Sequence, residues 1–125
     1  MDAEIKYIEL KSGYADDGPA WIGKLEFSKS GKSFYFNGHA FLGNGHGACY
    51  DAETGEEYWV SGVKKNGQDR HWAGKGKIML DKNLVNEYLK LVNIRFINPQ
   101  KYELVNISPT DKQKFNDLLN SKLEE

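Results

Sequence analysis

Two runs of alternating apolar and polar residues flank residues 29–32, and they constrain the fold more than any other feature of the sequence. With residues 29–32 in a turn, Phe27 lies opposite Phe34 and Trp21 opposite Ala40. Because side chains alternate between the two faces of a strand, this register separates an apolar face from a mostly polar one. The predicted inner face holds Trp21, Gly23, Leu25, Phe27, Phe34, Phe36, Gly38 and Ala40. The predicted outer face holds Ile22, Lys24, Glu26, Ser28, Ser33, Tyr35, Asn37 and His39.

A second hairpin is predicted around Asn66-Gly67, the dipeptide that a two-residue type I′ turn prefers. Pairing across that turn makes Trp59 and Trp72 diagonal neighbours on one face, with Arg70 beside them. An aromatic and cationic cluster of this kind is suited to binding. The residues predicted to bind a partner are Trp59, Lys64, Lys65, Arg70, His71, Trp72 and Lys75. The opposing interpretation is that both indoles belong to the core.

The remaining sequence predicts further short strands and then two helices. Residues 6–11 and a segment opened by Cys49-Tyr50 read as strands. After Leu80 the apolar period changes from two to 3.6, which predicts helices over residues 82–92 and 109–121. Asp81 is a suitable cap for the first helix, and Pro109 is suited to the first position of the second. Asn93 is a suitable end for the first helix.

These elements predict an α+β fold in a single domain, residues 1–125. A curled antiparallel sheet, or a small SH3-like or OB-like barrel, is expected over residues 5–80. Residues 81–125 are expected to form a helix, an extended segment and a second helix.

Composition limits the classes of partner. Seventeen basic and eighteen acidic residues leave a net charge of −1, so global electrostatics favour neither nucleic acid nor an anionic membrane. No apolar run approaches the roughly 18 residues that span a bilayer, and the N-terminus does not read as a secretory signal. The single Cys49 excludes an intrachain disulfide. We therefore expect a cytoplasmic protein; its oligomeric state does not follow from the sequence.

Two glycine motifs are weak evidence for nucleotide binding. Gly31-Lys32-Ser33 lacks the glycine five positions earlier, where Glu26 stands, and a strand follows where a phosphate-binding loop needs a helix. The glycine-rich segment 43–47 matches no dinucleotide fingerprint, because no strand-to-helix switch encloses it. The second motif reads as an inter-strand loop, and such a loop also suits ligand entry.

Catalytic and metal-binding signals are also weak. His46 and Cys49 have a spacing that zinc could use, with His39 and His71 as further ligands, but no second close pair of ligands exists. Cys49 with a histidine could form a nucleophilic pair, although a lone cysteine is more often a small core residue. The sequence thus indicates no cofactor and no metal, and we expect a non-enzymatic binding module, with a small enzyme using Cys49 as the alternative.

The class of partner depends on local charge. Residues 64–82 contain six basic and two acidic residues, a net charge of +4, and the basic side chains are interleaved with Trp59 and Trp72. That pattern is typical of surfaces that bind single-stranded nucleic acid. Asp51, Glu53, Glu56 and Glu57 precede it and can neutralise it. A protein partner is therefore the first expectation, and single-stranded nucleic acid is the alternative.

Much of residues 6–91, most specifically the run YWVSGVKKNGQDRHWAG, resembles a family of small uncharacterised bacterial proteins. Some members of that family carry a name borrowed from 1-deoxy-xylulose-phosphate synthase. The chain lacks the Gly-Asp-Gly segment and the following asparagine that hold magnesium in thiamine diphosphate enzymes, and it is far too short for that fold. The resemblance therefore implies neither that activity nor any catalytic residue.

Overall fold

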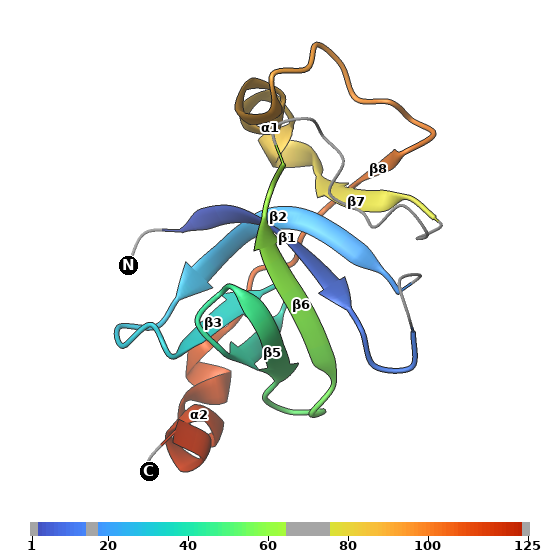
Figure 1. Cartoon of the computed structure of the whole chain (residues 1–125). Helices are drawn as coiled ribbons and strands as arrows, with labels where there is room; N and C mark the ends of the chain where they lie inside the picture. The colour runs from blue at the N-terminus through green and yellow to red at the C-terminus, as the bar shows by residue number, and fades with distance from the viewer. Residues whose placement is uncertain (1–2, 15–17, 65–75, 124–125) are drawn as a thin grey trace.

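The computed structural model describes residues 3–14, 18–64 and 76–123 (Figure 1). Within them the strands are β1 (Glu4–Leu10), β2 (Ala20–Phe27), β3 (Ser33–Phe36), β4 (His39–Leu42), β5 (Gly47–Asp51), β6 (Glu57–Gly62), β7 (Ile78–Asp81) and β8 (Tyr102–Val105). The helices are α1 (Val85–Val92) and α2 (Asn116–Leu123), and each follows one turn of 3₁₀ helix, Lys82–Leu84 and Lys112–Phe115 respectively.

Six strands close into an antiparallel barrel in the order β1-β6-β5-β4-β3-β2, and β2 returns to pair with β1. The predicted small barrel followed by two helices is therefore confirmed. Closure buries one face of every strand, which explains the alternating pattern of the sequence. The barrel interior holds Ile8, Leu25, Phe34, Phe36, Phe41, Cys49, Tyr58 and Val60, all buried.

The first predicted hairpin is correct at its turn and wrong at its far end. Glu26 lies opposite Tyr35 and Phe27 opposite Phe34, as the register around residues 29–32 predicts. β3 stops at Phe36, however, because Asn37 and Gly38 both take positive φ, 51° and 82°, and form a tight turn into β4. The sequence carried the signal, since Asn-Gly is the same dipeptide as at residues 66–67.

The turn at residues 37–38 reverses the predicted faces of the residues that follow it. His39 lies opposite Phe36 and Ala40 opposite Tyr35, and directly opposed residues share a face of the sheet. His39, predicted on the outer face, therefore belongs to the inner face at one end of the barrel. Ala40, predicted on the inner face, packs outside the barrel with Tyr35.

A second core covers the outer face of β1 and β2. β7 pairs in parallel with β2, β8 pairs in parallel with β7, and α1 connects them. The prediction that residues 78–80 continue an antiparallel sheet is thus wrong, because this segment pairs in parallel with β2. The helical crossover through α1 then brings β8 back in the same direction as β7. Ile22, predicted on the polar face, is fully buried in this core. Its buried members are Tyr7, Ala20, Ile22, Ile78, Leu80, Tyr88, Val92 and Tyr102.

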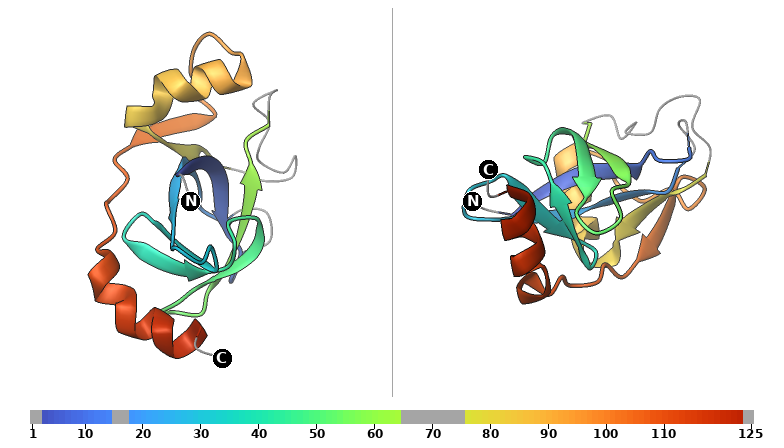
Figure 2. Two further views of the ribbon diagram at one scale, coloured as in Figure 1. Left: turned by 90° about the vertical axis from the view of Figure 1, so that its left-hand side faces the viewer. Right: turned by 90° about the horizontal axis from the view of Figure 1, so that it is seen from below.

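A third, smaller core lies under α2, where Phe115 and Leu119 pack on Tyr35, Ala40 and Ala52. The two helices therefore lie at opposite ends of the molecule with the barrel between them (Figure 2). Both helical segments begin where a carboxylate accepts a backbone N–H, Asp81 from Asn83 at 2.9 Å and Asp111 from Gln113 at 3.1 Å.

The predicted helix ends are nearly correct. Helical structure runs from residue 82 to 92, and Asn93 ends it with φ of 56° and its N–H bonded to Leu89 O. The last helical segment starts at Lys112 rather than at Pro109, because Asp111 is the residue that caps it. No helix in the described ranges is long and apolar enough to cross a membrane.

Candidate functional site

Only two of the residues predicted to bind a partner lie in the described part of the chain. Trp59 is on β6 with 44% of its surface exposed, and Lys64 is exposed two residues beyond the end of β6. Lys65, Arg70, His71, Trp72 and Lys75 lie outside the described residues, as does the Asn66-Gly67 turn. The question of whether Trp59 is core or surface is thereby answered in favour of the surface.

Trp59 stands on the outer wall of the barrel beside a second exposed aromatic residue. It lies opposite Ala48 on β5 and opposite Glu9 on β1. Tyr50, two residues after Ala48, shares that face and is 47% exposed. A diagonal pair of this kind spans roughly 7–8 Å between backbones, within reach of two large side chains. We call Tyr50 and Trp59 the aromatic face.

Sequence reasoning missed Tyr50 as a site residue. The signal was present, because alternation along the strand opened by Cys49-Tyr50 puts these neighbours on opposite faces. With Cys49 in the core, Tyr50 must point outward.

Cys49 lies in an environment that disfavours a nucleophilic role at neutral pH. It is 1% exposed inside the barrel, and its Sγ donates to the Tyr58 carbonyl at 3.7 Å. Burial, and secondarily the charge of Glu57, raise the pKa of the thiol from 9.0 to about 12. The thiolate is the reactive form, so the environment favours a structural role. No hydrogen bond joins Cys49 to a histidine among the described residues.

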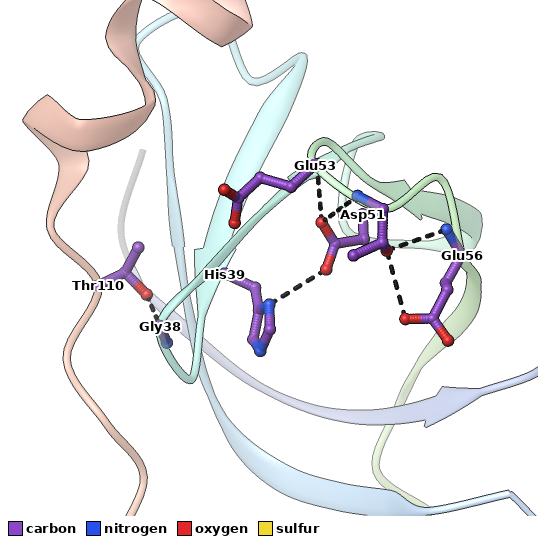
Figure 3. Close-up of polar contacts among 7 residues, drawn as sticks. Gly38, His39, Asp51, Glu53, Glu56 and Thr110 are labelled. Carbon is purple, nitrogen blue, oxygen red and sulfur yellow. Dashed lines mark hydrogen bonds and ion pairs between the residues drawn. The ribbon is translucent and has the colours of Figure 1, made fainter.

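His39 and Asp51 form the most distinctive polar contact of the barrel (Figure 3). Asp51 is 2% exposed, and its Oδ1 accepts the backbone N–H groups of Glu53 at 2.8 Å and Thr54 at 3.2 Å. Its Oδ2 lies 3.1 Å from His39 Nδ1, at ion-pair distance, and receives no well-aligned hydrogen bond from the described residues. The carboxylate thus both shapes the β5–β6 turn and holds one side of the imidazole.

The loop that carries His39 is fixed from the other side by the segment before α2. Gly38 N donates to Thr110 Oγ1 at 2.9 Å, and Ser108 N donates to Asn37 Oδ1 at 3.0 Å. Figure 3 shows His39 between this anchored turn and Asp51. Two segments remote in sequence therefore position the histidine.

Aromatic rings surround the same end of the barrel and leave a small cavity of about 30 Å³. The ring of Tyr58 lies edge-on to Phe41 at 4.9 Å between centroids and tilted to Trp21 at 6.5 Å. We call this cavity the aromatic mouth; its lining residues are Trp21, Phe36, Asn37, His39, Phe41 and Tyr58. Burial, followed by the charges of Glu56 and Asp51 and by Cys49, raises the pKa of Tyr58 to about 12, so its hydroxyl stays protonated at neutral pH.

The described structure does not support the predicted zinc site of His46 and Cys49, because Cys49 is buried inside the barrel. His46 is exposed in the glycine-rich loop, while His71 lies outside the described residues. No group of three or more His, Cys, Asp or Glu side chains in the described ranges could hold a metal ion. The glycine-rich loop itself packs closely on the barrel at Gly45, whose added Cβ would lie 2.5 Å from the Phe27 ring.

No protein-family model, curated protein sequence or solved structure matches the chain. The resemblance to a family of small bacterial proteins therefore stays a prediction. What the protein binds has to be inferred from its own residues.

Proposed function

We propose that the protein is a non-enzymatic binding module that contacts a protein partner through the aromatic face. The observation that carries this proposal is the pair of large aromatic side chains, Tyr50 and Trp59, each nearly half exposed on adjacent strands. Tryptophan and tyrosine are the residues that most often dominate the free energy of protein association.

The position of Trp59 lowers the entropic cost of binding. β6 is hydrogen-bonded to β1 along one edge and to β5 along the other, so the backbone that carries the indole is already ordered. Binding then has to order few additional groups, which is the main advantage of a preorganised surface.

Local charge favours protein over nucleic acid at this face. Residues 38–63 contain four acidic residues, Asp51, Glu53, Glu56 and Glu57, and no Lys or Arg. Carboxylates beside Tyr50 repel phosphate groups, whose neutralisation by basic residues drives nucleic-acid binding. Single-stranded nucleic acid remains the second candidate, because Lys64 and the basic residues that follow it in the sequence add positive charge beyond β6.

A cytoplasmic location is part of the same proposal, since the lone thiol of Cys49 needs no oxidising compartment. An enzyme using Cys49 is not favoured, given the burial and the raised pKa of its thiol.

The test begins with affinity capture from a bacterial lysate, identification of the captured protein and its purification. The dissociation constant is then measured for the wild-type chain, Trp59→Ala, Tyr50→Ala and the control Phe96→Ala. Phe96 is 74% exposed but lies in the segment after α1, away from the aromatic face. We expect Trp59→Ala to weaken binding by about 30-fold, the size of a hot-spot truncation, and Phe96→Ala to leave it unchanged.

Equal effects of Trp59→Ala and Phe96→Ala on the affinity would contradict the aromatic face as the contact surface. A parallel titration with a fluorescent oligothymidylate at two salt concentrations tests the second candidate. Tight binding that falls steeply with salt and is lost in Trp59→Ala would replace the protein partner with nucleic acid.

A further inference from the structure

The aromatic mouth is separate from the aromatic face, because it opens at one end of the barrel rather than on its outer wall. Tyr58 and Trp59 are neighbours in β6 and point to opposite faces, the first inward and the second outward. His39 reaches the mouth from the start of β4, and Trp21 from the start of β2. Variants of the two sites can therefore be tested independently.

The polar groups of the mouth are largely uncommitted. Among the described residues, the Tyr58 hydroxyl, the Trp21 indole N–H and His39 Nε2 take part in no hydrogen bond. Asp51 Oδ2 lies 3.1 Å from His39 Nδ1, so Nδ1 is the imidazole nitrogen that faces the carboxylate. The second imidazole nitrogen, Nε2, points away from Asp51 in Figure 3.

The charge around the mouth is negative. Asp51 stands behind His39 with its Oδ2 buried, and Glu56 is close enough to Tyr58 to raise the pKa of its hydroxyl. The faces of aromatic rings carry negative electrostatic potential and attract cations, more strongly where the site is desolvated. The aromatic mouth is therefore suited to a cation that can donate hydrogen bonds, because it combines acceptor groups, ring faces and nearby carboxylates.

We propose that the aromatic mouth binds the primary ammonium group of an alkylamine, either a free amine or a lysine side chain of another protein. The cavity is small, about 30 Å³, so we expect it to take a compact –NH₃⁺ group in preference to a bulkier trimethylammonium group, which also has no N–H to donate. The hydroxyl of Tyr58 and Nε2 of His39 accept from the ammonium, while the rings of Trp21 and Phe41 face its charge. The alkyl chain of the bound amine extends out of the cavity into solvent.

The experiment follows the backbone and indole N–H resonances of the ¹⁵N-labelled full chain during titration with butylammonium chloride. We expect saturable shifts that centre on Trp21, His39 and Tyr58. 1-Butanol has nearly the same shape without the charge, and tetramethylammonium has the charge with a larger head; both should bind at least about tenfold more weakly. A titration with Nα-acetyl-lysine amide then distinguishes the two kinds of ligand. Tighter binding of this compound than of butylammonium would indicate a lysine side chain of another protein, and tighter binding of butylammonium would indicate a free amine.

Two conservative variants test the named groups. Asp51→Asn keeps the oxygen that accepts from Glu53 and Thr54 but removes the charge, and we expect about a fivefold or greater loss of affinity. Tyr58→Phe keeps the ring and removes the hydroxyl, with an expected loss of about threefold or more. Trp59→Ala should leave the titration unchanged, which distinguishes the failure of this site from the failure of the aromatic face.

Equal binding of butanol or tetramethylammonium, or the absence of saturable shifts at the mouth, would overturn the proposal. Unchanged affinity in both Asp51→Asn and Tyr58→Phe, with wild-type spectral dispersion, would overturn it as well.

Discussion

The Cys49 thiol illustrates how burial changes the chemistry of a residue. Its pKa is raised from 9.0 to about 12, chiefly by desolvation, so above pH 9 the folded chain holds a proton that the unfolded chain releases. The free energy of unfolding therefore falls as pH rises from about 9 to 12, since the unfolded state binds fewer protons there. We expect Cys49→Ala to weaken this alkaline loss in urea titrations at pH 7, 9 and 10.5. A thiol reagent at pH 8 should modify Cys49 only in urea; rapid modification of the native protein would contradict its burial.

At the scale of elements, the β3–β4 turn decides which residues face the mouth. Gly38 takes φ of 82°, where a Cβ is strained, and its added Cβ would otherwise meet only Ser108 at 3.9 Å. We therefore expect Gly38→Ala to lower the free energy of unfolding by about 1–2 kcal/mol through backbone strain alone. Gly62→Ala is the matched control, because Gly62 lies on β6, lacks a positive φ and has open space around it. We expect the free energy of unfolding of this variant to be unchanged or slightly higher. Similar losses in both variants, measured by urea unfolding, would argue against strain at the turn.

For the whole molecule, three separate cores imply uneven stability. Phe34 is buried inside the closed barrel, and its truncation to alanine should cost about 3–5 kcal/mol and destabilise every element. Phe115 is equally buried but belongs to the small core under α2, which Leu119 and three barrel residues complete. We expect Phe115→Ala to abolish hydrogen-exchange protection in α2 while β1 and β6 keep most of theirs. Uniform loss of protection across the barrel in Phe115→Ala would show that α2 and the barrel open as one unit.

Local chemistry determined the features that the sequence predicted correctly. The turn at residues 29–32, the caps at Asp81 and Asp111 and the helix end at Asn93 depend on neighbours within a few residues, so their signals are complete in the sequence. The tight turn at Asn37-Gly38 was equally readable. The alternating pattern also determined the barrel, because closure is the way for short twisted strands to bury one face without free edges.

The tertiary structure decided everything that depends on what covers a face. Ile22 is buried because α1, β7 and β8 pack on the outside of β2, whereas Trp59 is exposed because no described element covers that part of β6. The alternating patterns of β2 and β6 could not by themselves show that the outer face of one strand is covered and that of the other is exposed. Likewise, His39 and Asp51 are twelve residues apart and meet only because β4 pairs with β5. A period-two sequence specifies that a strand has two faces, but the free energy of burying either one depends on segments that arrive from elsewhere in the chain.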